Sequence, residues 1–195
     1  MLFLCETVRV RVIAGQFRSR PLQSVPGIDL RPTSDRLRET LFNVLGAARD
    51  LSEIVWLDLY AGTGAVGIEA LSHGARQVYF VESEKKHARL LRENLNSLGI
   101  SAGFEVHERE VAKVLPLLDS TGVVCDVCFL DPPYRMRGLY DQTLGFLAQS
   151  HLLQSSTIVV AEHEKKFDLG ERFGALLRYR RLEQGDAVLS FYRLS

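Results

Sequence analysis

The sequence predicts an α/β fold in which a mostly parallel, Rossmann-like sheet is covered by helices on both faces. From residue 54 onward, short apolar segments alternate with longer amphipathic ones, as in repeated strand–helix units. A glycine-rich stretch at residues 60–67 joins the first apolar segment to a helix. The last two apolar segments flank Gln184-Gly185-Asp186, which predicts a hairpin that closes the sheet with antiparallel strands.

The 195 residues are enough for one domain of this kind, and the apolar segments are typical of strands buried on both sides. We expect seven strands, at residues 54–59, 77–81, 104–107, 123–130, 157–161, 178–183 and 187–194. We expect the covering helices at residues 65–73, 84–98, 111–118 and 140–149.

The N-terminal region has a different pattern. Apolar and basic residues alternate from Val8 to Val12, a turn is expected near Gly15, and a second extended stretch ends near Val25. This predicts a β-hairpin with one apolar and one basic face. Thr33 or Ser34 is then expected to cap a helix that runs to residue 45. We therefore divide the chain into an extension at residues 1–50 and a main domain at residues 51–195.

Charge is distributed unevenly along the chain. The formal net charge is zero, so a polyanion would have to be bound locally. The first 40 residues carry seven arginines and four acidic residues, and the planar guanidinium group suits phosphate contacts and base stacking. The candidate RNA-binding residues are Arg9, Arg11, Arg18, Arg20, Arg31, Arg36 and Arg38. An ordinary solvated face is the alternative, and Arg36 and Arg38 could instead pair inward as structural supports.

Other features argue against membrane, metal and disulfide functions. The apolar start at residues 1–5 is too short for a signal sequence, and no run approaches the roughly 18 residues of a membrane span. Cys125 and Cys128 lie within a predicted strand, where residues three apart point to opposite faces, so we expect two buried apolar side chains and no metal site. No long apolar helix face remains unpartnered. We expect a cytoplasmic monomer.

The strand ending at Leu59 leads into Gly62, Gly64 and Gly67, the G-x-G-x-x-G spacing of a loop that approaches a nucleotide-like cofactor. Asp58 stands four residues before Gly62. A carboxylate there would repel the pyrophosphate of a dinucleotide but favour an ammonium and a sulfonium group. The pattern therefore predicts S-adenosylmethionine.

Glu82 ends the second strand, where a carboxylate can accept hydrogen bonds from ribose hydroxyls, and Glu110 could reach an adenine amino group. A solvated loop acid is an equal alternative for Glu110. The predicted cofactor-binding residues are Asp58, Tyr60, Ala61, Gly62, Thr63, Gly64, Glu82, Ser83, Glu110 and Val111.

The predicted catalytic residues are Asp131, Pro132, Pro133 and Tyr134, which follow the fourth strand. The two prolines remove backbone donors from the turn, so we expect its carbonyls to be free of neighbouring N–H groups. Asp131 and the Pro132 carbonyl could accept the two hydrogens of an exocyclic amine, and Tyr134 could stack on the base. The loop therefore favours methylation of an amino group on a base, without a covalent enzyme intermediate.

Taken together, these residues make the chain similar to bacterial small-subunit (16S) ribosomal RNA guanine-N2 methyltransferases of the RsmD type. The resemblance covers nearly the whole chain, and its most family-specific part is Arg31-Pro32-Thr33, Arg36-Leu37-Arg38-Glu39 and Phe42-Asn43. Further matching residues are 11–15, 58–64, 67–71, 74–75, 131–134 and 185–186.

The resemblance implies a class I S-adenosylmethionine methyltransferase sheet of seven strands with an N-terminal hairpin extension that contacts RNA. It also implies one guanine of 16S rRNA as the substrate, modified on its 2-amino group within a small-subunit particle. Tyr60 and Thr63 stand where many members have phenylalanine and serine, and Glu110 stands where aspartate or asparagine is more usual.

Three other functions fit parts of the sequence. An adenine-N6 methyltransferase uses the same D-P-P-Y loop, but little of the chain is left over for a DNA target-recognition domain. An NAD-dependent oxidoreductase shares the glycine loop, and Asp58 argues against it. A non-catalytic RNA-binding factor would not need Asp58, Glu82 and Asp131 together.

Overall fold

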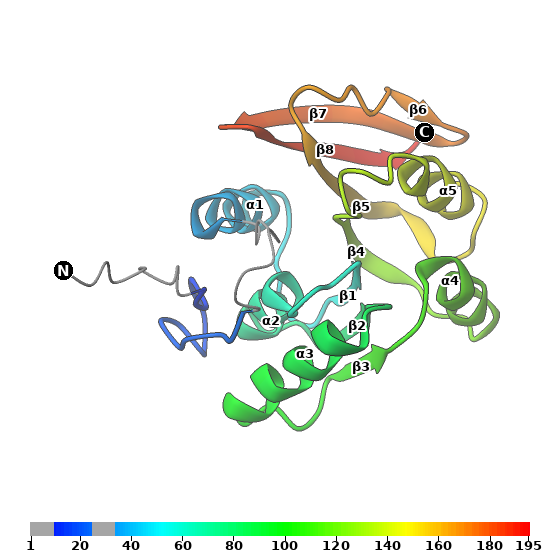
Figure 1. Cartoon of the computed structure of the whole chain (residues 1–195). Helices are drawn as coiled ribbons and strands as arrows, with labels where there is room; N and C mark the ends of the chain where they lie inside the picture. Colours follow the sequence, from blue (N-terminus) through cyan, green and yellow to red (C-terminus); the bar gives the residue numbers. More distant parts are fainter. Residues whose placement is uncertain (1–9, 25–33) are drawn as a thin grey trace.

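The computed structural model describes residues 10–24 and 34–195, whose strands form one sheet in the order β3-β2-β1-β4-β5-β8-β7-β6 (Figure 1). The strands are β1 Val55–Leu59, β2 Gln77–Val81, β3 Phe104–His107, β4 Cys125–Leu130, β5 Leu153–Glu164, β6 Arg172–Phe173, β7 Leu176–Gln184 and β8 Ala187–Leu194. The helices are α1 Asp35–Ala48, α2 Ala65–Ser72, α3 Lys85–Ser97, α4 Val111–Ser120 and α5 Gly138–Leu147.

The first five strands pair in parallel, and β8, β7 and β6 continue the sheet antiparallel. This confirms the predicted sheet, except that it has eight strands where seven were expected. The additional strand, β6, contributes only Arg172 and Phe173, and two residues are too few to show the alternation by which a strand is predicted.

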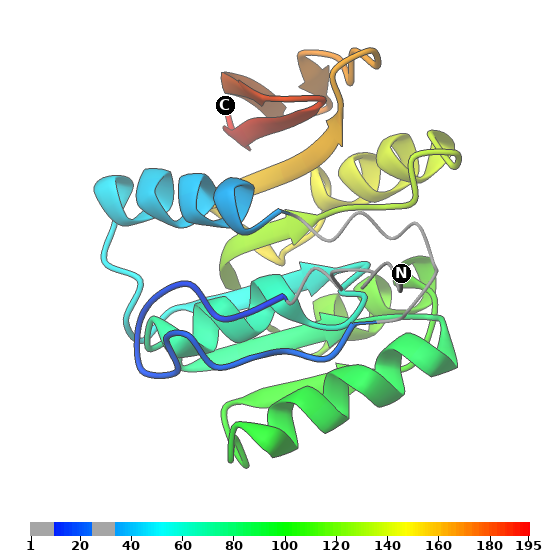
Figure 2. The ribbon, with the colours of Figure 1, turned by 60° about the vertical axis from the view of Figure 1, so that its left-hand side comes forward.

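Two apolar clusters lie on opposite faces of the sheet. One contains buried residues of α1, α2 and α3 together with Trp56, Phe80 and Phe129 from the strands. The other contains buried residues of α4 and α5 together with Leu57 and Leu59. Figures 1 and 2 show the corresponding layers, with α1, α2 and α3 on one side of the sheet and α4 and α5 on the other.

The two cysteines of β4 are buried and free, as expected, but the argument about their direction was wrong. Both pack into the cluster beneath α4 and α5. The pairing of β4 with β5 shifts register between Cys125 and Val127, so the simple alternation of faces fails there. Burial raises the pKa of both thiols, which disfavours the thiolate form that metal binding needs.

Residues 10–24 fold back on themselves, but they form no regular strands. Val12 N–H donates to the Arg20 carbonyl at 3.0 Å, Leu22 N–H donates to the Val10 carbonyl at 2.8 Å, and a single antiparallel bridge joins Arg11 to Pro21. Pro21 has no N–H and cannot extend a ladder of backbone hydrogen bonds. The predicted hairpin is therefore present as a paired loop, and its apolar face is buried through Val10, Val12 and Leu22.

This N-terminal loop is fastened to α2. The carboxylate of Glu69, a buried residue of α2, accepts hydrogen bonds from Ile13 N–H at 2.8 Å and Ala14 N–H at 2.7 Å. Gly15 has a φ of +76°, and a Cβ atom there would lie 1.9 Å from the Ser72 carbonyl oxygen. Only glycine allows this approach of the two backbones.

Helix α1 begins where it was predicted to begin, because the Ser34 hydroxyl accepts a hydrogen bond from Leu37 N–H at 3.2 Å. Phe42 stacks on Trp56 of β1 with ring centroids 5.3 Å apart and on His73 at 4.9 Å. The helix thus shares the core of the sheet. Within the described ranges, the structure contains no helix that is long and apolar enough to cross a membrane.

Candidate active site

Four acidic residues lie at or just beyond the carboxyl ends of neighbouring parallel strands. They are Asp58 in β1, Glu82 after β2, Asp131 after β4 and Glu162 in β5. Strands β1 and β4 pair directly, while the chain continues from β1 to β2 on one side and from β4 to β5 on the other. A reversal of this kind opens a ligand crevice at the carboxyl edge of the sheet.

Asp58 of β1 is hydrogen-bonded to the third glycine of the G-x-G-x-x-G sequence. It is 1% exposed, and its Oδ2 accepts a hydrogen bond from Gly67 N–H at 2.8 Å. Burial raises the pKa of Asp58 to about 7; the Gly67 N–H lowers it, and the charge of Glu82 raises it further. A Cβ atom at position 67 would lie 2.2 Å from the Phe80 ring and 2.8 Å from Asp58 Oδ2, so glycine is needed for this contact.

Glu82 is bonded to the same loop from the second strand. It is 8% exposed, and its Oε2 accepts a hydrogen bond from Gly62 N–H at 2.8 Å. Its Oε1 accepts another from Glu84 N–H at 2.7 Å. A carboxylate has about four acceptor positions, so Glu82 keeps capacity for the hydroxyl groups of a ligand.

The loop between β1 and α2 follows a tight path. Gly62 and Gly64 have φ values of +57° and +83°, and Tyr60 adopts +64°, which is unusual for a residue with a side chain. The Tyr60 hydroxyl forms a hydrogen bond of 2.7 Å with Thr143 Oγ1, which anchors the strained residue to α5. A Cβ atom on Gly62 would meet nothing within 4 Å, so the backbone there faces open space.

A buried side chain that the sequence analysis did not single out supports this loop. Asn94 of α3 donates to the Thr63 carbonyl at 3.0 Å and to the Gln23 carbonyl at 3.1 Å, and its Oδ1 accepts from Gln23 N–H at 2.7 Å. It therefore joins the glycine loop to the N-terminal loop. A buried asparagine in an amphipathic helix is the sequence signal that was available.

The electrostatics of the loop favour a cationic ligand. In dinucleotide-binding folds the N–H groups of the glycine loop and helix bind pyrophosphate. Here Gly62 N–H and Gly67 N–H already donate to carboxylates, so a pyrophosphate would meet two acids. An ammonium or sulfonium group beside Asp58 would instead stabilise its ionised form against burial. The residues present fit S-adenosylmethionine, the cofactor that the resemblance implies.

Three residues predicted to bind the cofactor lie at the margin of the crevice. Ser83 is exposed, and Val111 is buried at the start of α4. Glu110 is 64% exposed at its side chain and pairs with Lys113 at 3.0 Å. The Glu110 carboxylate is thus directed to Lys113, and this pairing gives no support to the predicted contact with adenine.

Asp131, the first residue after β4, is hydrogen-bonded to the neighbouring strand β1. Asp131 N–H donates to the Leu59 carbonyl at 3.4 Å, which places it beside the end of β1. Burial raises the pKa of Asp131 well above its usual range, and the charges of Glu162 and Asp58 raise it further. Pro132 is buried, and the Pro133 carbonyl accepts from Met136 N–H at 2.8 Å, a donor that lies beyond the D-P-P-Y turn.

Two residues that the sequence analysis missed border this loop. Glu162 is 3% exposed, and its Oε1 accepts a hydrogen bond of 3.4 Å from the Tyr134 hydroxyl. The Tyr140 hydroxyl donates to the Glu162 carbonyl oxygen at 2.7 Å. An acid following the apolar run 158–161 was a visible signal for Glu162, but the predicted strand ended before it.

The predicted RNA-binding arginines separate into three groups. Arg9 and Arg31 lie outside the described residues. Arg11, Arg18, Arg20 and Arg36 are exposed or partly exposed, with Arg11 paired to Asp35 at 3.4 Å. Arg38 is 0% exposed, and its guanidinium donates to the Arg11 carbonyl at 2.7 Å and to Asp35 at 2.8 Å. For Arg38 the structure therefore favours the alternative of inward pairing over RNA contact, because its charge is used inside the protein.

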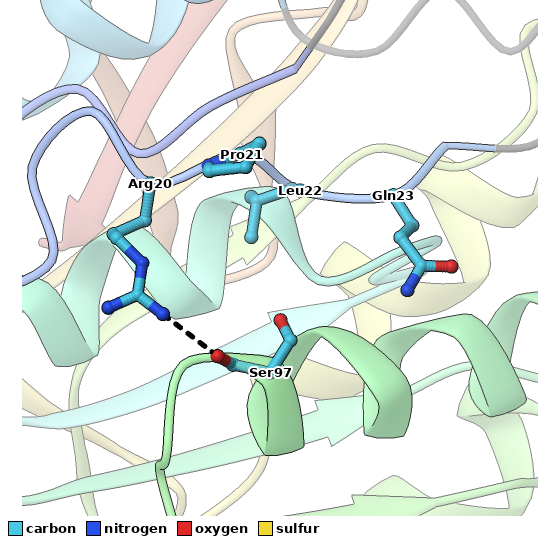
Figure 3. A pocket seen from close by; sticks show the side chains of 5 residues that line it. All are labelled: Arg20, Pro21, Leu22, Gln23 and Ser97. Carbon is cyan, nitrogen blue, oxygen red and sulfur yellow. Dashed lines mark hydrogen bonds between the residues drawn. The ribbon is translucent and has the colours of Figure 1, made fainter.

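A hollow of about 430 Å³ lies where the N-terminal loop crosses α3 (Figure 3). Arg20, Pro21, Leu22, Gln23 and Ser97 line it, and the Arg20 guanidinium donates to the Ser97 carbonyl at 2.9 Å. None of the predicted cofactor-binding or catalytic residues lines this hollow, so it is separate from the acidic crevice. Within residues 10–24 and 34–195, no group of three or more His, Cys, Asp or Glu side chains is placed to hold a metal ion.

Comparisons with known proteins agree with this geometry. The family model described as Conserved hypothetical protein 95 matches residues 10–193. Ribosomal RNA small subunit methyltransferase D of Haemophilus influenzae is 38% identical over 157 residues, which are 80% of this chain and 79% of that protein. Its Escherichia coli namesake (strain K12) is 34% identical over 156 residues, which are 80% of this chain and 75% of that protein.

Solved structures show the same architecture. The structure of yhhF from Escherichia coli superposes with a TM-score of 0.81 at 28% identity, covering 96% of this chain and 98% of that one. A hypothetical protein of Thermus thermophilus superposes with a TM-score of 0.79 at 30% identity, covering 93% of this chain and 98% of that one. The matches confirm the resemblance found in the sequence: the chain belongs to the Conserved hypothetical protein 95 family, alongside the ribosomal RNA small subunit methyltransferases D.

Proposed function

We propose that the protein transfers a methyl group from S-adenosylmethionine to the exocyclic 2-amino group of one guanine in 16S rRNA of the small ribosomal subunit. The observation that carries this proposal is that two groups of residues meet at the carboxyl edge of the sheet, and we call them the two acidic sets. The first is Asp58 and Glu82, and the second is Asp131 with the D-P-P-Y loop that it begins. Asp58 and Glu82 hold the glycine loop, and Asp131 begins an acceptor loop directly beside it.

The first set would bind the cofactor, which supplies a methyl group carried on a sulfonium. Asp58 would face the positively charged part of the ligand, where its negative charge is favourable. Glu82 would accept hydrogen bonds from the ribose hydroxyls while it keeps Gly62 N–H in place. Tyr60, Ala61, Thr63 and Gly64 would line the same crevice, with Ser83, Glu110 and Val111 at its margin.

The second set would hold the base. The nitrogen of an exocyclic amine is a poor nucleophile because its lone pair is delocalised into the ring. Acceptors on its hydrogens, from Asp131 and the Pro132 carbonyl, would orient it and stabilise the positive charge that develops during transfer. Tyr134 would stack on the base and hold the nitrogen in line with the methyl group.

The relatives' names support ribosomal RNA as the substrate, since they are small-subunit rRNA methyltransferases. We propose that residues 1–50 contact RNA and that residues 51–195 form the catalytic domain of a cytoplasmic monomer acting on a small-subunit particle. Arg11 pairs with Asp35 beside Arg36 in the first turn of α1, and the charge of Glu162, near the carboxyl end of β5, acts on Arg38 of the same helix. Arg18 and Arg20 lie beyond the end of α2, farther from the crevice.

The product of the reaction tests this function directly. Small subunits from a strain that lacks the gene should accept labelled methyl groups from S-adenosylmethionine, and nucleoside analysis should show N2-methylguanosine from one site. N6-methyladenosine, or label confined to DNA offered alongside, would refute the guanine assignment and favour an adenine methyltransferase.

Substitution of the two acidic sets should separate binding from transfer. Asp131→Asn should reduce transfer by about 100-fold or more, because the carboxylate charge that stabilises the developing positive charge on the amine is lost. Its affinity for S-adenosylhomocysteine, measured by calorimetry, should be nearly unchanged. Asp58→Asn should do the reverse and weaken that affinity roughly tenfold, about 1.4 kcal/mol.

The pH dependence of cofactor affinity provides a control for the role of Asp58. The pKa of this carboxyl is raised to about 7, so it is increasingly neutral below that pH and attracts a cation less well. Affinity of the wild type for S-adenosylmethionine should therefore fall as the pH drops below about 7, and the Asp58→Asn variant should lack this dependence. Loss of cofactor binding in Asp131→Asn would show that Asp131 has been misplaced.

The arginines of the extension can be tested through salt. Alanine at both Arg11 and Arg36 should weaken binding to a 16S rRNA fragment and make the dependence of log affinity on log salt shallower by about 1 to 2. Alanine at both Arg18 and Arg20 should have a smaller effect. Alanine at both Arg76 and Arg89, exposed on the β2–α3 side, serves as the matched control. An unchanged slope in all three variants would remove the extension from the RNA interface.

A further inference from the structure

A buried acid that the proposed chemistry does not use lies beside the acceptor loop. Glu162 is 3% exposed near the carboxyl end of β5. The parallel register aligns Leu130 of β4 with Ala161 of β5, so Asp131 and Glu162 occupy the next positions along two adjacent strands. The sheet itself therefore brings these two carboxyl groups together.

Glu162 also contacts the aromatic residue of the loop. The Tyr134 hydroxyl donates to Glu162 Oε1 at 3.4 Å, a long hydrogen bond that spans from the loop to the sheet. The Glu162 backbone is fixed in turn, because its carbonyl oxygen accepts from the Tyr140 hydroxyl of α5 at 2.7 Å. A rigid strand thus supports the ring that would stack on the base.

Charged groups surround this pair from several elements. Asp131 approaches from the loop after β4 and Asp58 from β1, and the charges of both Glu162 and Asp58 raise the pKa of Asp131. From α1, the buried guanidinium of Arg38 has a pKa lowered by burial, which the charges of Asp35, Glu69 and, least, Glu162 raise in opposition. From α5, the Tyr140 hydroxyl has a pKa raised by burial and by the charges of Asp131, Tyr134, Glu162 and, least, Glu164, which is not among the charges that raise the pKa of Asp131.

Glu162 is buried and Asp131 is partly buried beside it, so the two carboxyl groups cannot both ionise without strong repulsion. When one carboxyl group carries a proton, the repulsion is relieved, and the second group stays ionised and accepts hydrogen bonds.

We infer that Glu162 is a positioning residue of the transfer site, which orients the Tyr134 ring through its hydroxyl and shares one proton with Asp131. This inference rests on the proposed function and adds a residue to it. As the amine nitrogen takes the methyl group, the methyl–sulfur bond of the cofactor would break with its electron pair left on sulfur, and the nitrogen would become positively charged. One N–H bond then breaks, its electron pair stays on nitrogen, and the proton moves to the ionised oxygen of the pair and from there to water.

The proton shared by the pair can be measured without turnover. Carboxyl-labelled protein, followed by carbon NMR as the pH is changed, should show Asp131 titrating well above the usual aspartate range. In Glu162→Gln the titration of Asp131 should move to lower pH by about one unit or more, because one source of repulsion is removed. The matched control is Glu164→Gln, two residues along the same strand, which should leave the titration of Asp131 in place.

Kinetics test the positioning role. Glu162→Gln should lower kcat by about 100-fold with a smaller change in KM, and the acid limb of its pH–kcat profile should shift to lower pH. Tyr134→Phe keeps the ring but removes the hydroxyl contact, and its effect on kcat should be less than additive with that of Glu162→Gln. Thermal melting identifies any variant that fails to fold.

The outcomes separate this inference from the function beneath it. An Asp131 titration that is the same in wild type and folded Glu162→Gln would overturn the shared proton. Full additivity of Tyr134→Phe with Glu162→Gln would overturn the contact with the ring. If Glu162→Gln does not fold, two other results would overturn the inference. One is an Asp131 pKa in the wild type that is not raised. The other is a double variant, Tyr134→Phe with Glu162→Asp, whose pH–kcat profile matches that of the wild type. A wild-type protein that transfers no methyl to rRNA would refute the proposed function, while the titration of the pair would still stand.

Discussion

Two carboxylates of the protein itself bind the backbone N–H groups of its glycine loop, and much of the site's chemistry follows from this. Asp58 binds Gly67 N–H and Glu82 binds Gly62 N–H, each at 2.8 Å. In a dinucleotide-binding fold, N–H groups of this loop and helix serve an anionic ligand. Here their capacity is used internally, and the burial of Asp58 carries a cost that a cationic ligand would offset. The same backbone geometry thereby favours a different class of cofactor.

Buried polar side chains that bind backbone groups also hold the N-terminal extension against the core. Glu69 of α2 accepts the N–H groups of Ile13 and Ala14, and Asn94 of α3 links Gln23 to Thr63 of the glycine loop. Both contacts reach elements that also shape the crevice. The backbone of residues 10–24, which carries Arg11, Arg18 and Arg20, is therefore held relative to the site, and Arg38 contributes by donating to the Arg11 carbonyl.

Much of the architecture could be predicted from the sequence because it depends on local patterns. Apolar runs identified the parallel strands, and the bounds of β2 and β3 were predicted correctly. The glycine spacing with Asp58, and the D-P-P-Y sequence after β4, indicated which ends of which strands form the crevice. These signals are local because backbone conformation and close approach demand particular residues at particular positions.

What could not be predicted depends on contacts between distant segments. For Arg38 the sequence left RNA contact and inward pairing open, and the packing of α1 against the N-terminal loop decides for inward pairing because it buries the guanidinium. Glu162 lies next to Asp131 because the register of β4 and β5 pairs the preceding residues, Leu130 and Ala161. The opposite-face argument for Cys125 and Cys128 failed because of a register shift between two strands. Register and inward pairing are properties of the whole sheet.

The most direct test of this account is a crystal structure of the protein with S-adenosylhomocysteine bound. We expect the ligand at the carboxyl edge of β1 and β2, with its ribose hydroxyls bonded to Glu82 and its amino acid part on the Asp58 side of the glycine loop. We also expect the position left for the methyl group to face Asp131 and Tyr134. A ligand bound elsewhere, or one whose ribose leaves Glu82 untouched, would contradict the assignment of the two acidic sets.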